Sequence, residues 1–371
     1  MLFNLEPKNS RIDLYDRDYE LRELYDAVNR DEKIIVVYGV RRVGKTSLVK
    51  SFLSELTHPY VLIDVRRIYF TENSVSMTSL VKYMLNEFRG FMNISGRLWL
   101  SIKEILTKIK WIKVGSDSLE IRINGNVHVN LTELLDAINR WCIDNSTMFI
   151  IVLDEAQYMR FSNIRYDGVL AWAYDNLSNI KFIITGSEIG VLRDFLRLND
   201  AKAPLYGRYV KEIYVDRFSR ELSIDFLRAG FKELNVEVSD TELAEVYDKV
   251  DGVIGWVTLY GYLRGMVGLN HGDALSRVFE EGSKLVIDEL SELIRPARAR
   301  YLAILGAVAH GLDTWSEIKR YVEVKVGSIS DVRFNELLRN LVRYGYLAKI
   351  NDKYIIPDPM VKYTVLNYLG H

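Results

Sequence analysis

IIVVYGVRRVGKT, residues 34–46, is the stretch that decides the fold of this chain. Residues 34–38 are apolar and mostly β-branched, as expected of a buried parallel strand, and residues 47–53 show the apolar spacing of a helix. Between them, residues 39–46 satisfy the pattern G-x-x-x-x-G-K-[ST], whose glycines let backbone N–H groups turn inward around phosphates. Strand, loop and helix in this order predict a phosphate-binding loop.

We expect this loop to bind a nucleoside triphosphate, ATP or its product ADP. Lys45 is placed to reach the β- and γ-phosphates, and the Thr46 hydroxyl is placed to ligate Mg²⁺. The helix that begins near Lys45 adds unpaired N–H groups and a positive dipole end. The predicted phosphate-binding residues are Gly39, Val40, Arg41, Arg42, Val43, Gly44, Lys45, Thr46 and Ser47.

A second apolar run, MFIIVL at residues 148–153, ends in Asp154 and Glu155. Asp154 is predicted to hold the Mg²⁺ shell, mostly through water, since this ion takes few protein carboxylates. Glu155 is predicted to orient and polarise the attacking water. Two adjacent carboxylates are also common at a solvated helix start, so this pair gains its meaning from the phosphate loop.

Two further residues are candidates for sensing the γ-phosphate. The run KFIITGS, residues 181–187, ends in small hydroxyl residues, so that Thr185 or Ser187 is placed to donate a hydrogen bond to the phosphate or to the water; a simple turn is the alternative. Arg208 follows a glycine in PLYGR, residues 204–208, and is a candidate arginine finger or phosphate sensor. A solvated surface charge is the alternative for Arg208.

Composition restricts the class of protein. The chain has 371 residues, long for one core, and its net charge of −1 gives no global attraction to nucleic acid or membranes. A single cysteine, Cys142, excludes an internal disulfide and is expected to be a small core residue. Without an export pattern or an apolar run long enough to cross a bilayer, we expect no membrane contact and a cytoplasmic location.

The order of patterns predicts three units. In residues 1–218, strands alternate with helices, which predicts an α/β fold with a parallel sheet and helices on both faces, interrupted by a helix and hairpin insertion at about residues 95–140. Residues 219–294 show helical spacing alone and predict a helical lid. Residues 295–371 read as three helices and a hairpin, the order of a winged helix.

The predicted winged helix is the most basic part of the chain. From residue 298 onward it holds eleven Lys and Arg against seven Asp and Glu, a net charge of +4. Double-stranded DNA is therefore a candidate partner, contacted through Arg333, Arg339, Arg343, Lys349 and Lys353. Winged helices also dock onto proteins, and both interpretations stay open.

With these features together, the chain resembles the archaeal ATPases of the AAA+/STAND group, P-loop NTPases that join a phosphate-loop domain, a helical lid and a winged helix. The matching segments are residues 15–21, 39–48, 153–157, 185–187, 205–208, 251–256 and 358–359.

The resemblance implies roles for several residues. Arg17 and Glu20 would help to hold the adenine, Asp154 would serve Mg²⁺, Glu155 would be the catalytic carboxylate and Arg208 would lie near the γ-phosphate of its own or a neighbouring site. Two positions near the expected adenine pocket depart from the family pattern. Asp16 replaces a usual glycine, and Ile254 replaces a usual proline.

By this resemblance the chain is a Mg²⁺-dependent, slow ATPase that works as a nucleotide-controlled switch. Two hypotheses about its output follow. In one, it is a DNA-acting ATPase similar in architecture to the origin-recognition initiators. In the other, it is a signalling or scaffold switch, whose winged helix binds a protein partner or its own ATPase domain, or which self-associates.

Overall fold

The computed structural model describes residues 1–94, 96–115, 119–121, 129–162, 164–187, 189–198 and 200–369. Two parts of the predicted insertion, residues 116–118 and 122–128, lie outside these ranges. Around them, α5 (Gly96–Thr107), β3 (Ile112–Val114), β4 (Leu119–Ile121) and α6 (Leu131–Asp144) follow the predicted order of helix, hairpin and helix, with β3 and β4 antiparallel.

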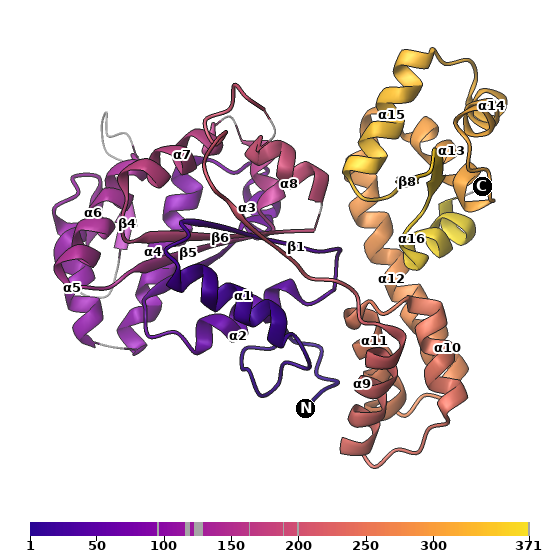
Figure 1. The fold of residues 1–371 in the computed structure, drawn as a ribbon, viewed down its shortest axis with the longest axis horizontal. Helices are drawn as coiled ribbons and strands as arrows, with labels where there is room; N and C mark the ends of the chain where they lie inside the picture. The colour runs from indigo at the N-terminus through magenta and orange to yellow at the C-terminus, as the bar shows by residue number, and fades with distance from the viewer. Residues whose placement is uncertain are drawn as a thin grey trace.

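A five-stranded parallel sheet forms the centre of the first half of the chain (Figure 1). Its strands are β1 (Ile34–Tyr38), β2 (Tyr60–Asp64), β5 (Phe149–Asp154), β6 (Ile180–Gly186) and β7 (Lys211–Tyr214), in the order β2-β5-β6-β1-β7. Every residue of β1, β5 and β6 is buried, as near-continuous apolar runs require of strands covered on both faces. The predicted parallel sheet with helices on both faces is confirmed.

The register of the strands brings three functional segments to one edge. Asp64 of β2 pairs with Asp154 of β5, and Tyr38 at the end of β1 pairs with Gly186 at the end of β6. Because all five strands are parallel, the segments that follow β1, β2, β5 and β6 leave the sheet together at its carboxyl edge, where ligands of open α/β sheets bind.

Helices cover both faces of the sheet. On one side, α1 (Asp18–Asn29) and α2 (Lys45–Ser54) bury residues such as Leu24 and Phe52 against the outward residues of β1. On the other side lie α4 (Met77–Ile94), α6, α7 (Tyr166–Asn176) and α8 (Ile189–Leu196), with α3 (Val65–Glu72) and the 3₁₀ helix η1 (Ala156–Phe161) nearby.

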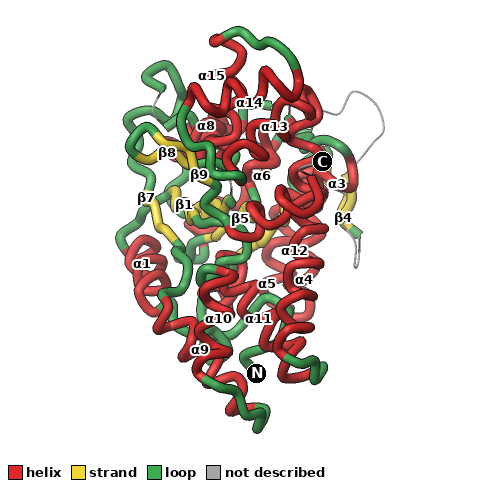
Figure 2. Tube along the Cα trace, turned by 90° about the vertical axis from the view of Figure 1, so that its right-hand side faces the viewer, coloured by secondary structure: helices red, strands yellow, loops and turns green. Residues whose placement is uncertain are grey.

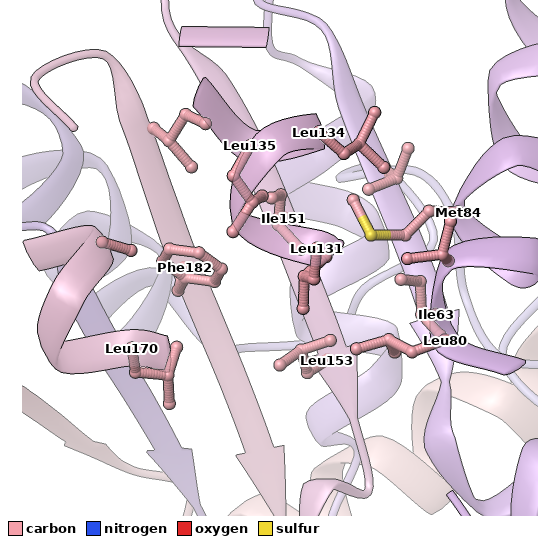
Figure 3. Close-up of a cluster of buried hydrophobic side chains, with 14 of the residues drawn as sticks. Ile63, Leu80, Met84, Leu131, Leu134, Leu135, Ile151, Leu153, Leu170 and Phe182 are labelled. Carbon is pink, nitrogen blue, oxygen red and sulfur yellow. The ribbon is translucent and has the colours of Figure 1, made fainter. Parts of the chain in front are cut away.

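Figure 3 shows the core on this second face. Labelled are Ile63, Leu80, Met84, Leu131, Leu134, Leu135, Ile151, Leu153, Leu170 and Phe182. Cys142 is fully buried in the same core, as expected, and burial raises the pKa of its thiol to about 12.

The second half of the chain is helical. It begins with α9 (Arg220–Glu233), α10 (Asp240–Val250), α11 (Ile254–Gly261), the π-helical turn Tyr262–Met266 and the long helix α12 (His271–Ile294), which form the helical lid. The 3₁₀ turn Arg295–Ala297 leads into α13 (Arg298–Ala309), α14 (Trp315–Val326), α15 (Asp331–Arg343) and the hairpin β8 (Ala348–Ile350) and β9 (Lys353–Ile355). This is the predicted order of a winged helix.

One more helix, absent from the sequence prediction, closes the chain. Helix α16 (Pro359–Thr364), extended by the π-helical turn Val365–Leu369, packs against α12. Asp358 caps it by accepting a hydrogen bond from the Met360 N–H at 2.8 Å, and Pro359 occupies its first position. The cap and the proline were the available sequence signals.

A single hydrophobic cluster joins the lid to the winged helix. It extends from Phe218 to Val365 and includes residues from α9 to α16. It also includes Phe3, whose ring packs onto two glycines of the lid: a Cβ at Gly230 or at Gly261 would lie 2.3 Å from that ring. The amino-terminal segment is therefore anchored in the lid, and the Leu2 N–H also donates to Glu233 Oε2 of α9 at 2.9 Å.

Candidate nucleotide site

The phosphate loop joins β1 to α2 through two positions of positive φ. Gly44, with φ of 95°, caps α2, and Arg42 has φ of 63°. Gly39 is required for a different reason, because a Cβ there would lie 2.5 Å from the Val215 carbonyl oxygen. The glycines therefore permit a tight loop that lies close to the end of β7 and leads directly into the N-terminus of α2.

The Lys45 side chain lies inside this loop. Its Nζ donates hydrogen bonds to the carbonyl oxygens of Gly39 at 2.8 Å and Val40 at 3.0 Å, and the residue is 4% exposed. Burial lowers the pKa of Lys45, while the carboxylates of Glu155 and Asp154 act in the opposite direction. The loop thus holds an ammonium group at its centre, facing the acidic strand end.

Thr46 and Asp154 meet as the sequence predicted they would. The Thr46 hydroxyl donates to Asp154 Oδ2 at 3.0 Å, and the Thr185 hydroxyl donates to Asp154 Oδ1. Burial raises the pKa of Asp154, and the neighbouring Glu155 raises it further. Hydroxyl and carboxylate oxygens are ligands that suit Mg²⁺, and a cation here would offset the cost of burying this carboxylate.

The Glu155 carboxylate accepts hydrogen bonds from two residues, Ser187 and Gln157, which are also hydrogen-bonded to each other. Its backbone is left-handed, with φ of 54°, and its Oε2 accepts from the Ser187 hydroxyl at 2.9 Å and from the Gln157 amide. Gln157 also donates to Ser187 Oγ at 3.0 Å. Burial alone would raise the pKa of Glu155, but the Lys45 charge and these hydrogen bonds hold that pKa below its usual value. The site therefore contains an ionised carboxylate.

The two small hydroxyl residues have different surroundings. Thr185 supports the strand end, since it donates to Asp154 and its oxygen accepts the Glu155 N–H at 3.1 Å. Ser187 lines a cleft beside Glu155. Gln157, fully buried, was missed by sequence reasoning because its contact with Ser187 depends on the pairing of β5 with β6.

Arg17 braces the phosphate loop. It donates to the carbonyl oxygens of Val43 at 3.2 Å and Asp216 at 2.7 Å, and to Glu20 Oε1 at 2.8 Å. Its guanidinium lies 4.7 Å from the centroid of the Phe218 ring. Both Arg17 and Glu20 are buried, and Arg17 lines the cavity described next.

A cavity of about 350 Å³ opens beside the loop. This volume lies in the range of small-molecule sites. Its walls include the phosphate loop from residue 42 to Ser47, the amino-terminal residues 4–8, and Ile254, Gly255 and Thr258 of the lid, and Arg17, Arg66 and Glu155 also line it. The Lys8 N–H donates to Ser47 Oγ at 3.1 Å, which ties the amino-terminal wall to the loop.

The two arginines of the loop point to the second half of the chain. The Arg42 carbonyl accepts the Gly255 N–H at 2.8 Å, and the Arg42 guanidinium lies 4.0 Å from the centroid of the Trp256 ring. Arg41 forms an ion pair with Glu289 of α12. The loop that surrounds Lys45 is therefore joined directly to the lid.

The family comparison agrees with this geometry. Residues 14–257 match a family described as an ATPase domain predominantly from Archaea. The chain belongs to this archaeal ATPase family. Residues 295–356 also match the C-terminal winged helix-turn-helix domain of MCM proteins.

Individual relatives extend over most of the chain. The solved Walker-type ATPase PABY2304 of Pyrococcus abyssi is 34% identical, with 99% of this chain and 100% of that chain covered and a TM-score of 0.83. The Aeropyrum pernix ORC2 protein in its ADPNP-ADP complexes is 12% identical over 99% and 98% of the two chains, with a TM-score of 0.59, and shares the fold. The uncharacterized protein MJECL04 of Methanocaldococcus jannaschii is 22% identical over 340 residues, or 90% of this chain; the chain spans 62% of that relative's length.

Arg208 of the archaeal ATPase domain lies away from the cavity. It stands just before β7, and because β7 is parallel to β1, this is the amino edge of the sheet, opposite the phosphate loop. Its Nε donates to Asp175 Oδ1 at 2.9 Å. Within one chain, the expectation that Arg208 lies near the γ-phosphate therefore fails, and a contact with a neighbouring copy's nucleotide stays a prediction.

Four of the five basic side chains that the sequence predicted to contact DNA pair with carboxylates. Their pairs, with nitrogen–oxygen distances, are Arg333–Glu336 at 2.6 Å, Arg343–Asp194 at 2.5 Å, Lys349–Asp352 at 2.7 Å and Lys353–Asp313 at 2.8 Å. Arg339 is exposed. Four of the side chains predicted for a DNA-facing surface are therefore engaged with carboxylates of this chain.

One of these pairs joins the winged helix to the ATPase domain. Asp194, the partner of Arg343, belongs to α8, and a Cβ at Gly190 of α8 would lie 2.8 Å from the Arg343 carbonyl oxygen. Helices α8 and α15 accordingly lie side by side in both Figure 1 and Figure 2.

Of the described helices, none is long and apolar enough to span a membrane.

Proposed function

We propose that this chain binds ATP with Mg²⁺ and hydrolyses it slowly, and that the bound nucleotide controls how the lid and the winged helix lie against the ATPase domain. The observation that carries the proposal is the convergence of Lys45, Thr46, Asp154 and Glu155 at one edge of the sheet, beside a cavity large enough for a nucleotide. Membership of the archaeal ATPase family supports it.

The phosphates would bind to the loop. The Lys45 ammonium would exchange its two backbone carbonyl partners for β- and γ-phosphate oxygens, which are stronger acceptors. Thr46 and Asp154 are the residues that would hold Mg²⁺, and the chemistry this ion supplies when bound is neutralisation of phosphate charge. Among the described residues, no cluster of three or more His, Cys, Asp or Glu could hold a metal, which suits an ion whose other ligands are phosphates and waters.

Hydrolysis would depend on Glu155. A water attacks the γ-phosphorus, the bond from this phosphorus to the β,γ-bridging oxygen breaks, and ADP leaves with the bonding electron pair. The ionised Glu155 carboxylate accepts the hydrogen bond of that water and takes its proton, while Ser187 and Gln157 keep the carboxylate oriented.

The contacts of Arg41 and Arg42 support the proposed switch. Phosphates that draw these two side chains inward would compete with Glu289 and with the Trp256 ring. A bound nucleotide would therefore change the contacts between the loop and the lid, and α12 carries any movement of the lid to the winged helix because both share one core. After hydrolysis, the original contacts would return.

For the output of the switch, the contact between α8 and α15 favours docking of the winged helix on its own ATPase domain. The close approach of Gly190 to Arg343 and the Arg343–Asp194 pair both occupy one end of α15. Contact with duplex DNA remains the second candidate, favoured by the match of residues 295–356 to the MCM winged helix. It would need Arg343 to leave Asp194.

ATP turnover by the purified chain, with and without Mg²⁺ and with and without duplex DNA, tests the proposal. We expect turnover that requires Mg²⁺ and is lost in Lys45→Ala. Absence of ATP binding in the wild-type chain would contradict the proposal. Stimulation by DNA, reversed by charge reversal at Arg339, would assign the output to DNA, whereas indifference to DNA would favour docking on protein.

A further inference from the structure

Arg66 stands at the carboxyl edge of the sheet, beside the acidic strand end. Helix α3 begins at Val65, directly after β2 ends at Asp64, and Asp64 is in register with Asp154 of the neighbouring strand. The second residue of α3 is thus placed next to the segment that carries Glu155. The phosphate loop follows β1, the third strand from β2 along the same edge.

The Arg66 side chain borders three adjoining cavities. It lines the nucleotide cavity together with Lys45 and Glu155. It also lines a cleft of about 210 Å³ that contains Glu155 and Ser187, and a hollow of about 590 Å³ that contains Arg41. Glu155 is shared by the first two of these spaces, so Arg66 lies on the side of the nucleotide cavity where hydrolysis would take place.

The electrostatic situation of Arg66 differs from that of the neighbouring arginines Arg17, Arg41 and Arg42. Arg17 pairs with Glu20, Arg41 pairs with Glu289, and the Arg42 guanidinium lies 4.0 Å from the centroid of the Trp256 ring. Arg66 has an exposed side chain, and within the described part of the chain no carboxylate forms an ion pair with it. The Arg66 guanidinium borders a cavity that already contains the Lys45 ammonium group, so the two positive charges favour an anionic ligand there. The planar fork of donors on a guanidinium matches phosphate oxygens.

We propose that Arg66 contacts the γ-phosphate of the ATP bound in its own chain. This inference rests on the proposed ATPase function and adds to it the residue that recognises the third phosphate. Arg66 donates hydrogen bonds to non-bridging γ-oxygens and stabilises the charge that develops there as the terminal phosphoryl group transfers to water. It remains a cation throughout and takes part in no proton transfer.

The position of Arg66 also explains how one chain can respond to ATP and ADP differently. ADP lacks the γ-phosphate, so it leaves the Arg66 guanidinium without this ligand. Because Arg66 and Arg41 line the same hollow, movement of Arg66 toward the phosphate changes the surroundings of the Arg41–Glu289 pair. Arg208 cannot serve this purpose within one chain, since it lies at the opposite edge of the sheet.

Arg67 provides a matched control. It is the next residue of the same helix and is likewise exposed, but its guanidinium lies 5.9 Å from the centroid of the Tyr83 ring, and its N–H donates to Asp64 Oδ1 at 3.0 Å. Replacement of either arginine by alanine removes one positive charge from α3. A general electrostatic effect would therefore appear in both variants, whereas a contact with the γ-phosphate would appear in one.

The experiment measures kcat for ATP and the dissociation constants of ATP and ADP in the full chain and in Arg66→Ala, Arg66→Lys and Arg67→Ala. For Arg66→Ala we expect kcat to fall about 100-fold and ATP affinity to weaken relative to ADP affinity. Arg66→Lys should recover part of kcat, because lysine restores the charge without the fork of donors. Arg67→Ala should behave as the wild type.

The outcomes separate this inference from the function on which it rests. If Lys45→Ala is inactive while Arg66→Ala keeps wild-type kcat and the wild-type ratio of ATP to ADP affinity, the assignment of Arg66 is wrong and the ATPase function stands. Equal losses in Arg66→Ala and Arg67→Ala would also overturn it. If the wild-type chain binds no ATP, the proposed function and the inference fail together.

Discussion

The guanidinium of Arg42 lies 4.0 Å from the centroid of the Trp256 ring, and the Arg42 carbonyl accepts the N–H of Gly255 at 2.8 Å. Arg42 belongs to the phosphate loop and Trp256 to the lid. Both the side chain and the backbone carbonyl of Arg42 therefore contact the lid. Gly255 is required for this approach, because a Cβ there would lie 2.7 Å from Arg42 Cβ. The loop and the lid therefore form one mechanical unit.

Replacement of Trp256 by leucine should loosen this unit. The cation–π contact is worth about 1 kcal/mol, and its loss should raise the rate of hydrogen exchange at the Gly255 amide, which donates to Arg42. Trp256→Phe should have a smaller effect, since phenylalanine is a weaker partner for a cation. Equal exchange rates in wild type and Trp256→Leu would show that the stacking does not hold the lid.

Glu155→Gln should separate binding from turnover. Glutamine keeps the size of the side chain and an acceptor for Ser187, so the cavity should still bind ATP with an affinity within about 10-fold of wild type, while turnover should fall by about 100-fold or more because the proton acceptor is lost. Isothermal titration and single-turnover kinetics measure the two quantities. Unchanged turnover would remove Glu155 from the proposed reaction.

Ser187→Ala tests the support of that carboxylate. Gln157 still donates to Glu155 in this variant, so turnover should fall by about 10-fold, less than in Glu155→Gln, with little change in ATP affinity. Gln157→Leu in the same background should bring turnover close to that of Glu155→Gln, because both donors are then missing. A loss in Ser187→Ala as large as that in Glu155→Gln would indicate direct contact of Ser187 with the nucleotide.

Gly252→Ala should destabilise the junction between the sheet and the lid. Gly252 has φ of 66°, and a Cβ there would lie 2.0 Å from the Phe218 carbonyl oxygen, so the substitution should cost about 2 kcal/mol or more in the free energy of unfolding. Gly168→Ala in α7 is the control. Nothing lies within 4 Å of its Cβ position, and alanine should stabilise that helix by about 0.5 kcal/mol. Thermal unfolding measures both, and similar melting temperatures would refute the prediction.

The parallel sheet, the phosphate loop and the winged helix were predictable because local patterns determine them. Strands β1 and β5 are near-continuous apolar runs, and Gly39 and Lys45 stand at a spacing that the loop requires. The acidic pair at residues 154–155 follows from the same logic, since parallel strands end at one edge.

Residues whose positions depend on the assembled fold escaped prediction. Phe3 lies in a short amino-terminal segment without helical or strand periodicity, so the sequence pattern does not predict that it enters the lid core. Arg66 and Gln157 acquire their places from the pairing of β2, β5 and β6. Arg208 lies at the far edge because β7 pairs parallel to β1, a fact that the sequence of that loop does not contain.

Gly190→Leu should detach the winged helix from the ATPase domain. A Cβ at Gly190 would lie 2.8 Å from the Arg343 carbonyl oxygen and 2.9 Å from its Cα, and backbone atoms cannot rotate away as a side chain can. The added leucine should therefore separate α8 from α15, break the Arg343–Asp194 pair and accelerate hydrogen exchange in α15. Gly272→Leu at the start of α12, where the nearest atom lies 3.6 Å from the Cβ position, is the matched control.

If the winged helix is the output of the switch, Gly190→Leu should also change the response of turnover to a partner. ATP affinity should stay near the wild-type value, because α8 contributes no wall to the nucleotide cavity. Exchange in α15 that matches the control would show that this contact does not hold the two domains together.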